Sequence, residues 1–86
     1  MALYLLDGRY TKLGLDLAKN DPNAKVVLIQ DGVYADISSL ADTREVYFIK
    51  DDLAKRGMEL PHPGAKVISY PDLIDLIEQE KIYNFV

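Results

Sequence analysis

Two apolar stretches that end in polar residues decide the fold of this chain: residues 26–33 read Val-Val-Leu-Ile-Gln-Asp-Gly-Val, and residues 46–57 read Val-Tyr-Phe-Ile-Lys-Asp-Asp-Leu-Ala-Lys-Arg-Gly. Each begins with β-branched and aromatic residues, which favour strands, and continues into residues that form turns or start helices. This pattern is typical of a buried strand that ends at a turn or helix. In α/β proteins, binding sites are built at such strand ends.

Two further apolar runs, 2–6 and 66–69, join 25–30 and 45–50 as expected strands. The runs are near-continuous rather than alternating, as in parallel strands that are covered on both faces. More than a dozen residues separate successive runs, which is enough for the crossover that parallel neighbours need. We therefore predict one α/β domain over residues 1–86. It would be a small three-layer sandwich, with a mostly parallel four-stranded sheet in the order of about 2-1-3-4 and helices on both faces.

The segment 9–20 between the first two strands carries the apolar spacing of an amphipathic helix. The residues of this stripe are Tyr10, Leu13, Leu15, Leu17 and Ala18. Turn-forming residues at 20–23 then end the helix.

The later connections predict three more helices and a docked tail. A weak pattern at 35–40 indicates a short helix, and 51–56 indicates another, capped by Asp51 or Asp52 and ended by Gly57. Pro71 suits the first position of a final helix. The apolar tail 82–86 needs cover, so we expect it to dock on the chain's own core or on a partner.

Composition excludes several classes of function. The 86 residues contain no cysteine, which rules out disulfides, thiolate metal sites and cysteine catalysis. The lone histidine, His62, stands between two prolines and is expected in a turn, so a histidine metal cluster is not expected either. Gly8 and Gly32 are isolated and form no phosphate-binding loop. We predict a protein without enzymatic activity, bound metal or cofactor.

The charge pattern bears on partners and location. The formal charge is −4 and the basic residues are scattered, with Lys55-Arg56 the only adjacent pair, so direct nucleic-acid binding is not expected. No stretch has the length and apolarity of a membrane span, and the first apolar run meets Asp7 too soon for a signal peptide. We expect a cytoplasmic protein.

A set of polar and small residues follows the expected strands and should gather at the carboxyl edge of the sheet. This set comprises Asp7, Arg9, Asp31, Gly32, Lys50, Asp51, Asp52 and Arg56. Two interpretations stay open. An Asp at a strand-to-helix junction and an Asp-Gly pair normally supply a cap and a turn. The acids, together with Arg9 and Lys50, could also bind a cation or a polar ligand.

Aromatic residues are the candidates for an interface. Six of the eight aromatics are tyrosines, and tyrosine is enriched at interfaces because it combines apolar area with a polar tip. The interface candidates are Tyr34, Tyr47, Tyr83 and Phe85. The alternative, that the tyrosines cap the edge of the core, stays open.

Taken in order, three segments resemble the DsrH/TusB family of sulfur-relay proteins. They are 28–33 (Leu-Ile-Gln-Asp-Gly-Val), 46–57 and 68–77 (Ile-Ser-Tyr-Pro-Asp-Leu-Ile-Asp-Leu-Ile). The resemblance covers nearly the whole chain. It implies the fold of the DsrE/DsrF/DsrH group, whose complexes pass sulfane sulfur as a cysteine persulfide toward tRNA thiolation or sulfur oxidation.

The resemblance also implies partners. In such assemblies a DsrE/TusD-like subunit carries the main acceptor cysteine, and some DsrH proteins have their own cysteine near the first helix. Segment 9–19 has none here, so this chain cannot carry a persulfide. We predict a non-catalytic subunit that binds a second copy of itself, in a homodimer or higher oligomer, or DsrE/TusD-like and DsrF/TusC-like subunits. The alternative is a small ligand-binding or enzymatic α/β domain that uses Asp7, Arg9, Lys50 and Asp51.

Overall fold

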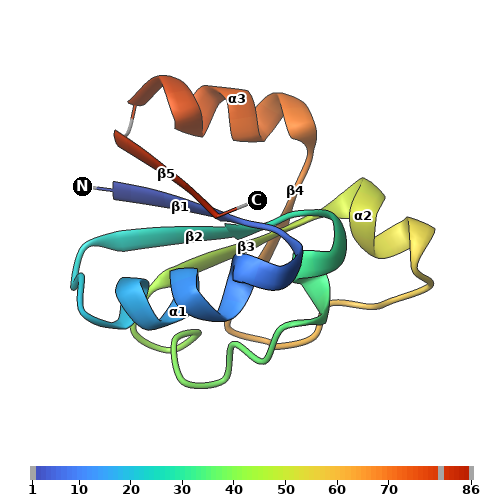
Figure 1. Ribbon diagram of the computed structural model, residues 1–86. Coiled ribbons are helices and arrows are strands. Elements are labelled where there is room, and N and C mark those ends of the chain that lie inside the picture. Colours follow the sequence, from blue (N-terminus) through green and yellow to red (C-terminus); the bar gives the residue numbers. More distant parts are fainter. Residues whose placement is uncertain (1, 80, 86) are drawn as a thin grey trace.

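The computed structural model describes residues 2–79 and 81–85, the latter as backbone apart from Ile82. Five parallel strands form one sheet in the order β4-β3-β2-β1-β5 (Figure 1). The strands are β1 (Ala2–Leu6), β2 (Ala24–Leu28), β3 (Glu45–Ile49), β4 (Lys66–Ile68) and β5 (Lys81–Phe85). The helices are the 3₁₀ helices η1 (Gly8–Tyr10) and η2 (Gln30–Tyr34) and the α-helices α1 (Thr11–Lys19), α2 (Lys50–Lys55) and α3 (Tyr70–Gln79).

The layers follow from the direction in which the chain crosses the sheet. From β1 to β4 each strand is added on the same side, and the connections, α1 among them, pack on one face. From β4 the chain returns across the sheet to β5, and α3 lies over the opposite face (Figure 1). Crossovers of one hand require this change of face when the direction reverses. The α/β class and the three-layer arrangement predicted from the sequence are confirmed.

Each face of the sheet has its own hydrophobic core because strand side chains alternate. Tyr4, Leu6 and Phe48 belong to the core on the α1 face, whereas Leu3 and Ile49 belong to the core under α3. Leu3, Leu6, Phe48 and Ile49 are fully buried. The near-continuous apolar runs of the sequence therefore reflect strands that are covered on both sides.

The number and order of strands differ from the prediction. Residues 81–85 form a fifth strand parallel to β1, so the tail docks on the chain's own sheet. The order is 4-3-2-1-5 rather than about 2-1-3-4, since β2 pairs with both β1 and β3. An apolar run in the sequence indicates a strand. Which strands become neighbours depends on packing between distant segments, and the apolar pattern carries no information on that.

Two predictions about helices were also wrong. Residues 35–40 form no helix; η2 precedes them at Gln30–Tyr34. Neither Asp51 nor Asp52 caps α2, whose N-cap is Ile49 without a side-chain hydrogen bond. Gly57 does end α2, in the left-handed conformation at φ 63° that glycine adopts without strain.

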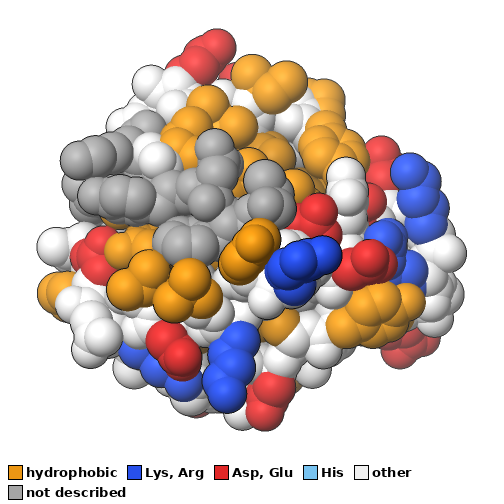
Figure 2. Space-filling model, viewed as in Figure 1, with side chains coloured by type: hydrophobic (Ala, Val, Ile, Leu, Met, Phe, Trp, Pro, Cys, Tyr) orange, Lys and Arg blue, Asp and Glu red, His pale blue; other side chains and the backbone are white. Residues whose placement is uncertain are grey.

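The apolar stripe of α1 points in two directions. Leu15 and Ala18 are buried against the sheet, as an amphipathic helix requires. Tyr10, Leu13 and Leu17 are exposed to 46%, 52% and 44%. Figure 2 shows hydrophobic side chains over α1 and over α3. Leu13 and Leu17, together with Tyr10 at the N-cap of α1, form the outer stripe of α1, an apolar surface that the core of the domain does not use.

Candidate functional site

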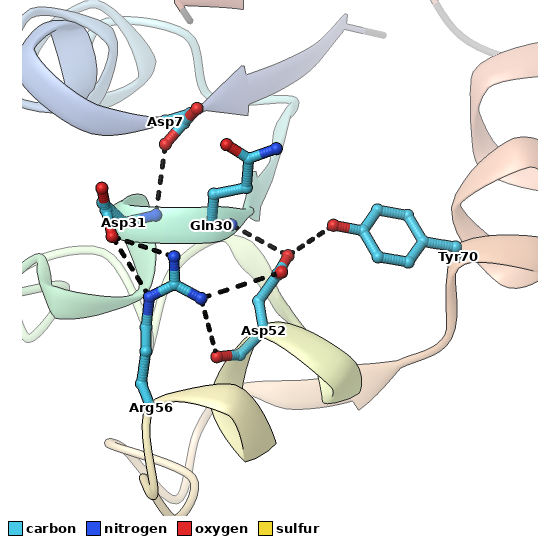
Figure 3. A network of polar contacts seen from close by, with 6 residues as sticks. All are labelled: Asp7, Gln30, Asp31, Asp52, Arg56 and Tyr70. Atoms are coloured by element: carbon cyan, nitrogen blue, oxygen red, sulfur yellow. Dashed lines mark hydrogen bonds and ion pairs between the residues drawn. The ribbon is translucent and has the colours of Figure 1, made fainter.

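The carboxyl ends of the strands bring together six residues that are far apart in the sequence. Figure 3 shows them as one network of polar contacts: Asp7, Gln30, Asp31, Asp52, Arg56 and Tyr70. They come from the ends of β1 and β2, from α2, and from the start of α3. The meeting of parallel strand ends at one edge is what the sequence predicted.

Asp52 is the centre of this network. It is only 2% exposed, and its Oδ2 accepts a hydrogen bond from the backbone N–H of Gln30 at 2.9 Å. The hydroxyl of Tyr70 donates to the same oxygen at 2.6 Å. A buried carboxylate needs such donors because burial removes its water. Asp52 in α2 therefore links two segments that are distant in the sequence. Gln30 follows β2, and Tyr70 follows β4 at the start of α3.

Burial and this contact change the pKa of the Tyr70 phenol. Burial disfavours the phenolate, and the hydrogen bond to Asp52 favours the protonated form. Together they raise the pKa of Tyr70 to about 12. Tyr70 therefore acts as a hydrogen-bond donor over the physiological pH range.

Arg56, just after α2, makes the second set of contacts. Its Nη2 and Nε donate to Oδ1 of Asp31 at 2.9 and 3.2 Å, and its Nη1 donates to the backbone carbonyl of Asp52 at 3.1 Å. Nη1 also lies 3.9 Å from Oδ1 of Asp52. The hydrogen bonds to Asp31 raise the pKa of Arg56. The guanidinium lies 5.9 Å from the centre of the Tyr34 ring, within range of a cation–π contact.

The segment η2 is fixed against the end of β1. The backbone N–H of Asp31 donates to Oδ1 of Asp7 at 3.2 Å, and the N–H of Ile29 donates to the carbonyl of Leu6 at 3.0 Å. A Cβ atom at Gly32 would overlap the carbonyl oxygen of Leu6. Only glycine therefore allows this close approach of two backbones.

Gln30 carries backbone strain at the same junction. Its φ is 47°, in the left-handed region that residues other than glycine rarely occupy. The hydrogen bond from its N–H to Asp52 holds the residue in this conformation. The network thus stabilises an unfavourable backbone turn directly after β2.

The predicted site residues divide into two groups. Asp7, Asp31, Asp52 and Arg56 meet in the network, and Gly32 lies beside it. Arg9, Lys50 and Asp51 are exposed and take no part in it. Asp31 and Gly32 lie within the 3₁₀ helix η2.

Gln30 and Tyr70 follow the second and fourth expected strands, which places them at the carboxyl edge of the sheet, but sequence reasoning did not carry them into the set of candidate site residues. Their contact with Asp52, across 22 and 18 residues, depends on the tertiary fold.

The interface candidates also divide. Tyr34 is 62% exposed. Tyr47 is only 9% exposed, packs in the core under α3 and donates its hydroxyl to Glu45 at 3.0 Å, so it offers little surface to a partner. The side chains of Tyr83 and Phe85 lie outside the described residues.

The network has the properties of a structural junction. Oδ2 of Asp52 already accepts two hydrogen bonds, and Arg56 is bound to carboxylate and carbonyl oxygens.

Among the described residues, no group of three or more His, Cys, Asp or Glu side chains could hold a metal ion. His62 accepts a hydrogen bond from the backbone N–H of Gly64 at 2.9 Å, as a turn residue does. In the same part of the chain, no helix is long and apolar enough to cross a membrane.

Comparison with known proteins places the chain in a family. The crystal structure of the ychN protein from E. coli superimposes with a TM-score of 0.69, covering 98% of this chain and 97% of that one. The two are 14% identical, so the likeness shows a shared fold. No curated protein sequence matches the chain. The sequence profile of the family described as "DsrH like protein" matches residues 10–82, and the chain therefore belongs to the DsrH-like family, as the resemblance of its ordered segments predicted.

Proposed function

We propose that this protein is a non-catalytic subunit of a sulfur-relay complex of the DsrEFH or TusBCD type. The observation that carries the proposal is a DsrH-family match in a chain without cysteine. Family membership supports a sulfur-relay role in general. A persulfide needs a cysteine sulfur, so the sulfur in transit would be held by other subunits. This chain would supply shape and contact surface.

The outer stripe of α1 is the surface we assign to a partner. Its three side chains, Tyr10, Leu13 and Leu17, are each about half exposed and follow one another at helical spacing. Apolar side chains grouped on a surface are typical of interaction sites, and aromatic residues are enriched in the centre of interfaces. The proposed occupants are DsrE/TusD-like and DsrF/TusC-like subunits, or a second copy of this chain.

The polar network supports this role by fixing the edge of the sheet. Asp31 and Arg56 hold η2, and Tyr34 at the end of η2 presents its exposed ring beside Arg56. A surface that is ordered before binding loses less conformational entropy when a partner docks. We therefore interpret the network as positioning for contact residues rather than as a catalytic set.

The pathway and location complete the proposal. The complex would act in the cytoplasm and deliver sulfur toward tRNA 2-thiouridine formation or sulfur oxidation. A net charge of −4 argues that tRNA would be bound by another component. Weak binding of tRNA to this protein alone, with little dependence on salt, is the result expected from that assignment.

Light scattering after size-exclusion chromatography tests the proposal. The protein is run alone and with DsrE-like and DsrF-like subunits from the same source. We expect a complex larger than the monomer, which Leu13→Glu and Leu17→Glu weaken by placing a charge in an apolar contact. Val67→Glu is the matched control, because Val67 is 42% exposed on β4 at the other edge of the sheet.

Two results would contradict the proposal. One is a strict monomer that ignores the candidate subunits at micromolar concentration. The other is equal weakening by the α1 variants and by Val67→Glu, which would place the contact elsewhere. Circular dichroism of each variant shows whether it keeps its fold.

A further inference from the structure

A cavity of about 510 Å³ lies between α1 and η2. Arg9, Thr11, Lys12 and Leu15 contribute to the wall formed by η1 and α1, and Tyr34 contributes to the opposite wall. Its size falls within the range of pockets that hold small organic molecules. The Asp52 network lies outside it, although Asp31 borders both.

Thr11 marks the cavity as more than a surface depression. The residue is 6% exposed, and its Oγ1 is buried without a hydrogen-bond partner among the described residues. A buried hydroxyl left without a partner costs free energy, so folded proteins normally pair it. Thr11 is among the residues that line the cavity, and a side-chain rotation that opens the hydroxyl to it would let an oxygen atom of a bound molecule accept the hydrogen bond.

The charges around the cavity select the sign of that molecule. Each acid on its wall is already engaged: Asp16 with Lys19 at 3.8 Å, Asp31 with Arg56 at 2.9 Å, and Asp36 with the backbone N–H of Ser38 at 3.0 Å. Asp16 and Asp31 are therefore paired with cations, whereas Asp36 accepts from a neutral donor.

Not all of the basic side chains on the same wall are paired with an acid. Arg9 and Lys12 form no ion pair within the described part of the chain, and Arg9 only approaches the ring of Tyr10, at 5.9 Å. The first turn of α1 itself carries no acidic residue. The unsatisfied charge at this end of the cavity is positive.

The rest of the lining indicates an organic body. Leu15, Tyr34 and Ala35 supply apolar or aromatic surface, and the volume exceeds what a single oxyanion group would fill. We propose that the cavity binds a small organic molecule with a phosphate or carboxylate group. The oxyanion would lie against Arg9, Lys12 and the Thr11 hydroxyl, and the organic part against Leu15 and Tyr34. This site does not rest on the subunit role, although it shares Tyr34 with the surface proposed for a partner.

Titration with phenyl phosphate tests the proposal. Phenol serves as the probe without charge, and inorganic phosphate as the probe without an organic body. Amide spectra by NMR at low ionic strength should show phenyl phosphate shifting residues 8–12 and 34–36. Inorganic phosphate should bind more weakly, and phenol should leave these signals unchanged. Equal shifts from phenol, or none from phenyl phosphate at millimolar concentration, would overturn the proposal.

Variants separate binding from structure. Arg9→Gln and Thr11→Val should each raise the dissociation constant by about tenfold, whereas Thr11→Ser and the distant control Lys55→Gln should leave it unchanged. Without ligand, Thr11→Val should melt at the same temperature as the parent protein or higher, because it removes an unpaired buried hydroxyl. A lower melting temperature would show that the hydroxyl has a partner in the fold and would overturn its assignment to a ligand. Unchanged affinity in both Arg9→Gln and Thr11→Val would do the same for the whole site.

Discussion

Two neighbouring regions at the carboxyl edge of the sheet use their polar groups in opposite ways. Around Asp52, the polar groups are joined to one another: the carboxylate accepts hydrogen bonds from Gln30 and Tyr70, and Arg56 donates to Asp31. In the cavity beside α1, Arg9 and Lys12 have no ion pair and Thr11 has an unpaired hydroxyl, within the described residues. The first region stabilises the fold. The second has binding capacity that the fold does not use.

The largest effect is expected from breaking the network at its centre. Asp52→Ala leaves the Gln30 N–H and the Tyr70 hydroxyl without their acceptor, so we expect the free energy of unfolding to fall by about 3 to 5 kcal/mol. Urea denaturation measures this loss. Asp51→Ala is the matched control, since Asp51 is exposed in the same first turn of α2. Equal losses in the two variants would contradict the central role of Asp52.

Gly32→Ala should disturb the segment that borders both regions. Its new Cβ would meet the backbone of Leu6, which cannot move aside without displacing β1, and we expect a loss of about 3 kcal/mol. Gly57→Ala has open space around its Cβ, so only its positive φ opposes the change, at about 1 kcal/mol. Thermal unfolding of both variants compares them. A smaller loss at position 32 than at position 57 would show that η2 does not pack against Leu6 as closely as this structure has it.

Tyr70→Phe tests one bond of the network and its dependence on pH. At neutral pH we expect a loss of about 1 to 2 kcal/mol, because Asp52 loses its shortest hydrogen bond. The folded-state pKa of Tyr70 is raised to about 12 from an ordinary value of 10.0, so the folded protein holds this proton more tightly. That stability is fully present below pH 10 and is lost as the pH rises through 12.

The measurement is the difference in unfolding free energy between the parent protein and Tyr70→Phe. It should shrink as the pH rises from 10 to 12. Tyr10→Phe, at an exposed tyrosine, should show no such trend. A constant difference for Tyr70→Phe over that range would show that the phenol does not depend on Asp52.

The smallest effect contrasts Arg56 of the network with Arg9 of the cavity. Arg56→Gln should lower the melting temperature, though less than Tyr70→Phe, because it removes the contacts to Asp31 and to the Asp52 carbonyl. Arg9→Gln should leave the melting temperature unchanged in the absence of ligand, since Arg9 makes no ion pair in the described structure. Differential scanning fluorimetry resolves the two. Equal destabilisation would remove the distinction between a structural and a binding arginine.

The sequence predicted local structure well where the residues that determine a structural element lie within that element. The four long apolar runs became β1 to β4, and the positive φ of Gly57 ended α2 as expected. Prediction from sequence failed where the determining contact comes from another part of the chain. Asp52 looked like a helix cap, but the fold turns it toward Gln30 and Tyr70. The stripe of α1 looked like a core face, but Leu13 and Leu17 point outward.

By itself the amino-acid sequence determined the parallel α/β class, the absence of a cysteine chemistry and the segments that mark the DsrH-like family. These depend on residue type and on spacing along the chain. Only the tertiary structure decided the strand order, the partners of Asp52 and the cavity with its unpaired Thr11 hydroxyl. The physical reason is that burial and hydrogen bonding between distant segments depend on which surfaces pack together. That choice belongs to the whole chain rather than to any one stretch of it.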